Sequence, residues 1–178
     1  MVFRCSARRG SCVLFLAPPG LPLFRGIDVA RAGGATHVAG CTGATSESAV
    51  QALHGLPDTS MLDMGDFAGG LMKYLRRHPV PRLTIGGGIG KMTKLAQGAR
   101  DLHSARCQVD FTALAQVLDR PELAKANTAL EAHELAGSEM AQWVAHSALA
   151  NCRSILQTGD ITVDCVVIDR TGQILARS

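Results

Sequence analysis

Short apolar runs and amphipathic segments alternate along the chain from about residue 25 onward. A short apolar run is typical of a buried strand, and apolar positions three and four residues apart indicate a helix with one buried face. In the first half the pattern predicts helices over 25–32, 45–54 and 67–77 and strands over 36–41, 60–64 and 82–85. Glycine and proline residues separate these segments by short connections. This alternation predicts a parallel sheet with right-handed crossovers.

The second half is richer in helical pattern. Helices are predicted from the glycine-rich stretch at 86–90 to about 102, over 111–118 and 121–136, and from 138 to a stop at 159. Residues 161–168 and 173–176 have the character of two strands joined by a turn that contains Gly172. The predicted fold class is therefore α/β. It comprises a mostly parallel sheet with flanking helices in a Rossmann-like three-layer arrangement, C-terminal helices and a terminal β-hairpin.

The most distinctive local pattern is Gly86-Gly87-Gly88-Ile89-Gly90-Lys91, which follows a strand and opens a helix. Glycine allows a ligand to approach the backbone and tolerates tight-turn dihedrals, and free N–H groups at a helix start attract anions. The stretch predicts a pocket for a nucleotide-like or carboxylate-bearing ligand. The alternative is a tight turn whose glycines serve packing only. A P-loop is excluded, because Ile85 and Met92 stand where that motif needs Gly and Ser or Thr.

Residues that follow the predicted strands are the candidates for ligand binding, because open parallel sheets bind ligands beyond the carboxyl ends of their strands. Hydroxyl groups after the first strand suit a carboxylate or phosphate, and carboxylates after the second suit a ribose diol or an amino group. The candidate binding residues are Thr42, Gly43, Thr45, Ser46, Asp63, Asp66, Gly86, Gly87, Gly88 and Gly90. Helix capping is the alternative role for the hydroxyls and for Asp66, which precedes the helix over 67–77.

Two further side chains are candidates for catalysis. Lys91 would pair with an acidic ligand, or alternatively lie solvated at the start of its helix. His103, near the predicted end of the same helix, suits a general base or a hydrogen-bond donor because histidine titrates near neutrality. Its alternative role is to bind the last carbonyl groups of that helix.

Composition narrows the class of protein. The 178 residues suffice for one domain with a core, and with only 4% aromatic residues that core is aliphatic. The net charge is only +3, and the basic residues form no nucleic-acid-binding motif. No nucleic-acid partner is therefore expected. The six cysteines show no CxxC pair and no paired spacing with histidine. They indicate reduced structural thiols of a cytoplasmic protein, and no protein metal site is expected.

The first 24 residues differ from the rest. Basic residues followed by the apolar run 12–17 imitate a signal peptide, but the prolines at 18, 19 and 22 interrupt it. The run is also too short to span a membrane. We therefore predict an irregular segment over 1–24 and a single α/β domain over 25–178.

Four motifs occur in a specific order. They are Thr42-Gly43-Ala44-Thr45-Ser46-Glu47, Met64-Gly65-Asp66-Phe67-Ala68-Gly69, Gly90-Lys91-Met92-Thr93-Lys94-Leu95-Ala96-Gln97-Gly98 and His103-Ser104. Together they resemble the cobalt-precorrin-5B C1-methyltransferase family of cobalamin biosynthesis. The resemblance runs from about Arg25 to the C-terminus and covers only the C-terminal half of the family's members. Residues 1–24 do not look like family sequence, which suggests a misassigned start and a truncated chain.

The resemblance implies an enzyme that transfers a methyl group from S-adenosylmethionine to C1 of cobalt-precorrin-5B, giving cobalt-precorrin-6A. The glycine stretch and Asp66 would belong to the methyl-donor pocket, and His103 and Lys91 would contact acidic side chains of the macrocycle. Cobalt would arrive only within this substrate. The corrinoid substrate is then the expected partner, and no membrane partner is expected. Whether the chain forms a homo-oligomer is left open. Two alternatives remain: a non-catalytic α/β fragment, and an unrelated nucleotide- or phosphate-binding module.

Overall fold

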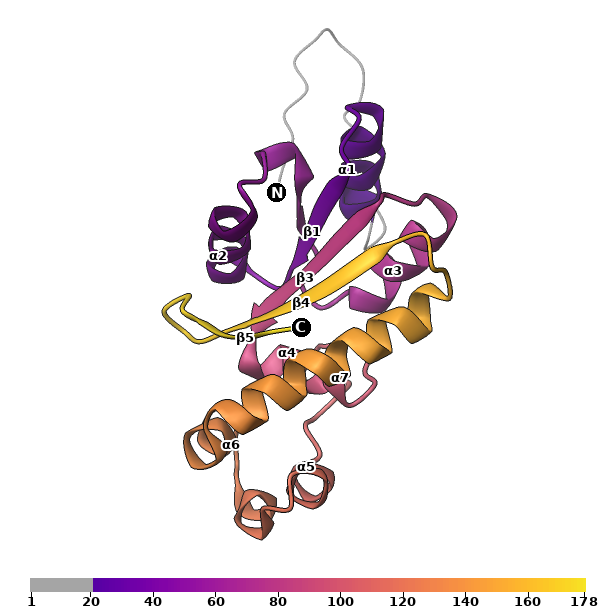
Figure 1. Cartoon of the computed structure of the whole chain (residues 1–178). Coiled ribbons are helices and arrows are strands. Elements are labelled where there is room, and N and C mark those ends of the chain that lie inside the picture. The colour runs from indigo at the N-terminus through magenta and orange to yellow at the C-terminus, as the bar shows by residue number, and fades with distance from the viewer. Residues whose placement is uncertain (1–20) are drawn as a thin grey trace, which may run out of the picture.

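The computed structural model of the chain describes residues 21–178 (Figure 1). Its first helix, α1 (Leu21–Ala32), begins earlier than the predicted start at residue 25. Pro22 lies in the first turn of α1, where proline is favoured because the N–H group that it lacks would have no partner. Residues 21–24, predicted to be irregular, are thus helical. The rest of that predicted segment, 1–20, lies outside the described residues.

A five-stranded sheet forms the centre of the fold (Figure 1). Its strands are β1 (His37–Cys41), β2 (Met61–Asp63), β3 (Arg82–Gly88), β4 (Thr162–Ile168) and β5 (Ile174–Arg177). They lie in the order β2-β1-β3-β4-β5. The first four are mutually parallel, and β5 is antiparallel to β4. The predicted mostly parallel sheet and the terminal β-hairpin are confirmed.

The helices cover the two faces of the sheet unequally (Figure 1). Among the described helices, α2 (Ala44–His54) packs on one face, where Val50 meets apolar side chains of β1 and β4. The opposite face holds the main core, with α1, α3 (Ala68–Arg77), α4 (Ile89–Ala96) and α7 (Ser138–Leu156). The chain steps from β1 to one edge and then returns to β3, so right-handed crossovers place α2 opposite the later helices.

Side chains alternate between these faces along the central strands. In β3, Leu83 and Ile85 are buried in the main core, whereas Thr84 lies on the α2 side, within 3.4 Å of the His54 ring nitrogen Nε2. Asp164 of β4 lies on the same side and binds Thr84. Polar side chains therefore gather on the α2 face near the amino ends of the strands.

The C-terminal helices stack beyond α4 and α7 (Figure 1). The single helix predicted over 121–136 is wrong: the structure has a 3-10 helix, η2 (Pro121–Lys125), and then α6 (Ala129–Ala136). Thr128 caps α6, because its hydroxyl accepts the N–H of Glu131. The Glu131 carboxylate in turn accepts the N–H of Asn127. This local pairing starts a new helix and ends the preceding turn. Two shorter elements complete the fold, α5 (Phe111–Val117) and η1 (Asp58–Ser60).

The glycine-rich stretch is not a turn. Strand β3 continues through it to Gly88, which is the N-cap of α4, so the strand passes directly into the helix. Helix α4 ends at Ala96, well before the predicted end near Leu102. Gly98 adopts a left-handed φ of 94°, and the Asn151 side chain binds the carbonyl groups of Leu95 and Ala96. These two features end the helix.

The cysteines of residues 21–178 are all free thiols, and most of them are buried. Burial raises the pKa of Cys41 to about 12. The thiols of Cys152 and Cys165 lie 4.0 Å apart in the core, and this contact together with burial raises the pKa of Cys165 well above its usual range. Separately, no helix within this part of the chain is long and apolar enough to cross a membrane.

Thiol labelling is expected to separate the cysteines by burial. At pH 8 the native chain should react with iodoacetamide at Cys107, which is partly exposed, and remain unmodified at Cys41, Cys152 and Cys165. The thiolate is the reacting form, so a buried thiol with a raised pKa reacts slowly. Peptide mass spectrometry after timed quenching would measure this, with the urea-unfolded chain as the control in which all four react. Labelling of Cys41 as fast as Cys107 would contradict the described packing.

Candidate functional site

A cleft of about 540 Å³ lies at the carboxyl ends of β1, β3 and β4. The connections after β1 and β3 lead to opposite sides of the sheet, which leaves a crevice where the two strands end side by side. In doubly wound α/β sheets ligands bind at this topological switch point. The residues that line the cleft are Thr42, Gly43, Ala44, Thr45, Ser46, Gly88, Ile89, Gly90, Lys91, Thr128, Ala129, Leu130, Ile168, Asp169 and Arg170.

Two helices begin at the cleft without side-chain caps. Helix α2 starts after Gly43 and α4 after Gly88, and no side chain of the described chain caps either start. The first N–H groups of a helix have no acceptor within it, and the helix dipole adds partial positive charge there. The cleft therefore presents two sets of backbone donors that suit a carboxylate or a phosphate.

The four glycines predicted within the stretch 86–90 divide into two groups. A Cβ atom on Gly86 would lie 2.5 Å from Val50 Cγ2, and one on Gly87 would lie 2.8 Å from Thr42 Oγ1, so packing explains these two. A Cβ on Gly88 would meet nothing within 4 Å, and one on Gly90 would come no closer than 3.9 Å to its neighbours. Gly88 and Gly90 line the cleft, while Gly86 and Gly87 do not. Ligand contact thus stays a prediction for Gly88 and Gly90.

The predicted hydroxyl groups also differ in their roles. Ser46 is only 3% exposed, and its hydroxyl donates to the Gly43 carbonyl at 2.8 Å, within the first turn of α2. Thr45 is exposed and Thr42 is half-buried, and both line the cleft. The Ser46 hydroxyl is thus engaged within the helix without capping it, and the two threonines remain candidates for ligand contact.

Lys91 and Asp66 form an ion pair beside the cleft. The Lys91 ammonium lies 3.1 Å from Asp66 Oδ1 and donates to the Thr42 carbonyl at 3.0 Å. The prediction that Asp66 caps α3 is wrong, because Phe67 occupies the N-cap position and makes no side-chain capping bond. The preceding Gly65 adopts a left-handed φ of 55°, and Lys91 takes the carboxylate instead. Lys91 is therefore held in the cleft wall by two partners.

Asp63 and His103 lie outside the cleft. Asp63 ends β2 and lines a separate cavity with Leu62 and Phe67. His103 follows the end of α4 rather than lying in its last turn, so the prediction of a helix-terminal histidine is wrong. Its exposed ring accepts the Ala105 N–H at 3.2 Å and lines a neighbouring cavity with Asp66. Among residues 21–178, the end of β2 is linked to the cleft wall by the Asp66–Lys91 pair.

The opposite wall of the cleft was not predicted. It consists of the start of α6 at 128–130 and the turn after β4 at 168–170. Hydrogen bonds from Thr171 lower the pKa of Asp169, which keeps this carboxylate ionised next to Arg170. A signal was present in the sequence, because a strand over 161–168 that is parallel to the others must end at the same edge of the sheet. The pattern of residues 161–176 predicts a hairpin turn here and nothing about the cleft.

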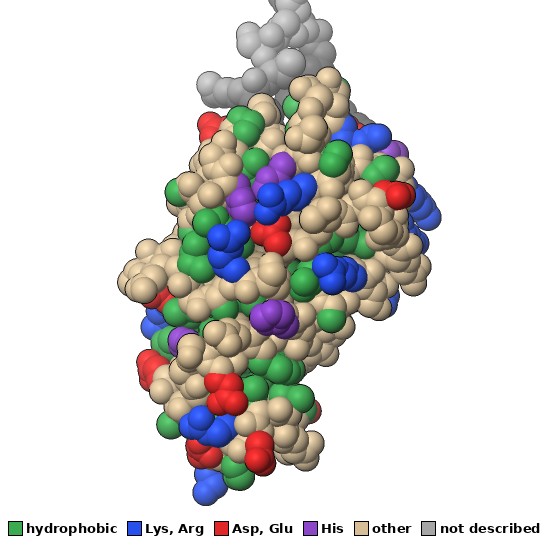
Figure 2. Space-filling view, viewed as in Figure 1, with side chains coloured by type: hydrophobic (Ala, Val, Ile, Leu, Met, Phe, Trp, Pro, Cys, Tyr) green, Lys and Arg blue, Asp and Glu red, His purple; other side chains and the backbone are tan. Residues whose placement is uncertain are grey.

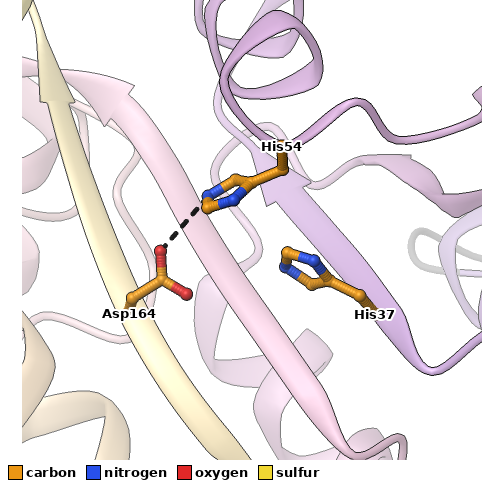
Figure 3. Close-up of side chains that lie close together, drawn as sticks. All are labelled: His37, His54 and Asp164. Carbon is orange, nitrogen blue, oxygen red and sulfur yellow. Dashed lines mark ion pairs between the residues drawn. The ribbon is translucent and has the colours of Figure 1, made fainter.

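A second group of polar side chains lies at the other end of the strands (Figure 3). This polar cluster comprises His37, His54, Arg82, Thr84 and Asp164. Thr84 Oγ1 donates to Asp164 Oδ1 at 2.9 Å and lies 2.8 Å from His37 Nε2. Burial lowers the pKa of both imidazoles, and the Arg82 charge adds to that effect. No local pattern along the chain indicates the cluster, because its members come from four separate elements.

The fold and the cleft together define a doubly wound α/β protein with a cleft at its switch point. Residues 101–178 match the family model described as the CbiD C-terminal domain. The chain is 53% identical over 166 residues to the cobalt-precorrin-5B C(1)-methyltransferase of Brucella anthropi, covering 87% of this chain and 45% of that protein. It is 51% identical over 160 residues to the same-named protein of Paramagnetospirillum magneticum, covering 85% of this chain and 45% of that relative.

These matches confirm the resemblance to the cobalt-precorrin-5B C1-methyltransferase family. The chain spans about half the length of the curated relatives that it matches. No solved structure matches the chain.

Proposed function

We propose that this chain binds S-adenosylmethionine in the cleft and serves the C1-methylation of cobalt-precorrin-5B to cobalt-precorrin-6A. The observation that carries the proposal is the pair of uncapped helix starts at the switch point, in a chain that is 53% identical to a protein with that activity in its name. Bound S-adenosylmethionine supplies an electrophilic methyl group on its sulfonium sulfur.

The residues of the cleft fit such a donor. The N–H groups at the starts of α2 and α4 suit its carboxylate, and the Asp169 carboxylate suits its ammonium or sulfonium charge. Thr42 and Thr45 offer hydroxyl groups to the ribose or to the carboxylate. The open positions at Gly88 and Gly90 leave room for the ligand against the backbone.

The role of the protein in this reaction is mainly one of positioning. The nucleophile is a carbon of the macrocycle, so the chain has to hold two reactants in line and exclude water. Lys91, held by Asp66 and the Thr42 carbonyl, is placed to meet an acidic group of the second reactant at the cleft wall. In this arrangement Lys91 orients the macrocycle and forms no covalent bond.

Donor binding and turnover are tested separately, because the chain spans about half the length of its relatives. Isothermal titration calorimetry with S-adenosylmethionine and S-adenosylhomocysteine is expected to show saturable binding at one site. Absence of heat and of any thermal shift at millimolar ligand would reject the donor site. Competition by inorganic phosphate but not by adenosine compounds would identify a phosphate-binding module instead.

Turnover is measured with cobalt-precorrin-5B and S-adenosylmethionine, with the Brucella anthropi relative as the positive control. Formation of a product with one added methyl group at C1 would support the full proposal. Donor binding without product, while the relative turns over, would assign the chain to the non-catalytic class.

A further inference from the structure

The polar cluster contains one carboxylate oxygen that the fold leaves without a hydrogen bond. Asp164 is 8% exposed, and its Oδ1 atom binds Arg82 at 3.2 Å and Thr84 at 2.9 Å. Within residues 21–178 no group donates a hydrogen bond to the buried Oδ2 atom. His54 Nε2 faces this oxygen at 3.4 Å, which is longer than an ordinary hydrogen bond, so the contact leaves room for a cation that would bind both groups.

We propose that His37, His54 and Asp164 bind a single zinc ion. The three side chains point toward one another from β1, the end of α2 and β4 (Figure 3). One ligand atom from each lies within 4.8 Å of the other two. The site lies near the amino ends of the strands, at the opposite end of the sheet from the cleft, and the inference does not depend on the proposed function.

The spacing between His54 and Asp164 suits zinc. Bonds from zinc to imidazole nitrogen and carboxylate oxygen are about 2.0–2.2 Å long, so two ligands of a tetrahedral ion lie roughly 3.3–3.5 Å apart. His54 Nε2 lies 3.4 Å from Asp164 Oδ2, which is longer than an ordinary hydrogen bond and within this range. A ring nitrogen of His37 completes a set of two imidazoles and one carboxylate, and water would fill the fourth position as at other three-ligand zinc sites.

The surroundings orient the carboxylate for this role. Arg82 and Thr84 both bind Oδ1, and the second oxygen faces the His54 imidazole. Such outer contacts to a metal-binding carboxylate fix its direction. The rings of His37 and His54 stand edge to face, with centroids 4.9 Å apart, so the two imidazoles are neighbours on the same side of the sheet as Asp164.

The positive charges near the site limit its affinity. Arg82 lies beside Asp164, and the charge of Arg177 acts on His54. Both repel a cation, so we expect micromolar rather than tighter binding. Histidine, basic and acidic side chains are visible together on one face of the molecule (Figure 2). His37 is only half-buried, which leaves a route for the ion to enter.

The test uses the full chain after chelator treatment and dialysis. Calorimetry with zinc chloride alone is expected to show one site per chain, and zinc should raise the melting temperature by several degrees, because an ion that binds only the folded state stabilises it. His37→Gln, His54→Gln and Asp164→Asn are each expected to weaken zinc binding at least tenfold. His146→Gln, at an exposed histidine on α7, is the matched control and should bind as the parent does.

A spectroscopic readout keeps the proposal testable should Asp164→Asn fail to fold. Cobalt(II), bound in place of zinc by the unmodified chain, should give visible bands of a nitrogen- and oxygen-ligated ion, and these bands should disappear in His54→Gln. An intense near-ultraviolet thiolate-to-cobalt band would place the ion on cysteine and overturn the proposal. Unchanged zinc affinity in the three cluster variants, or no binding by the parent, would overturn it too.

Discussion

A Gly88→Val variant is expected to bind S-adenosylmethionine at least tenfold more weakly while melting close to the parent. Gly88 has φ −67° and ψ 154°, an extended conformation that valine adopts without strain. Its Cβ position meets no atom within 4 Å, so the added side chain projects into free space in the cleft and does not disturb the core. A tenfold loss corresponds to about 1.4 kcal/mol, which calorimetric titration resolves.

Two matched glycine variants distinguish this loss from general damage. Gly86→Val is expected to destabilise the fold by about 1–3 kcal/mol, because its Cβ would lie 2.5 Å from Val50 Cγ2 in the core. Gly159→Val, which has open space around it and lies outside the cleft, should leave both affinity and melting temperature unchanged. Tight donor binding by folded Gly88→Val would remove Gly88 from the proposed site.

The positions of the strands could be predicted because each central strand is a compact apolar run between breakers. Strands β1 and β4 lie within a residue or two of their predicted bounds, and the parallel order follows from the alternation with helices. The cleft could be predicted for the same reason, since parallel strands bring the residues after β1 and β3 to one edge.

The errors arose where one side chain or one backbone angle ended an element. Apolar periodicity continues past Ala96, but the left-handed Gly98 and the Asn151 side chain end α4 there. The pattern Thr128-x-x-Glu131 was a visible capping signal that periodicity alone overlooked. The glycine stretch resembles a turn in sequence, because a glycine needed for an unusual backbone angle and a glycine needed because no side chain fits look the same. The structure shows that volume explains Gly86.

The polar cluster and the α6 wall of the cleft could not be predicted from spacing. His37 and Asp164 are separated by most of the chain, and they meet only because β3 brings β1 and β4 to its two sides. Thr128 reaches the cleft because α6 packs against α4. Contacts of this kind depend on tertiary packing, and no local pattern in the sequence encodes them.

A Leu71→Ala variant is expected to lose about 2–5 kcal/mol of unfolding free energy, the usual cost of a buried leucine. Leu71 is fully buried on α3, in the main core. It packs over Gly40 of β1, where an added Cβ would lie 2.3 Å from Leu71 Cδ2. Gly40→Ala alone should therefore also destabilise, by about 1–3 kcal/mol, because it overfills the same space. Urea unfolding followed by circular dichroism would measure both changes.

The double variant Leu71→Ala with Gly40→Ala tests this contact directly. The methyl group at position 40 would enter the space that the leucine leaves, so the combined loss should be smaller than the sum of the single losses by roughly 0.5–3 kcal/mol. Leu75→Ala is the matched control, since Leu75 is equally buried on the same helix but is not among the atoms nearest to a Cβ at position 40. Combined with Gly40→Ala it should give additive losses. Additivity in the Leu71 pair would mean that α3 does not pack on β1 through this contact.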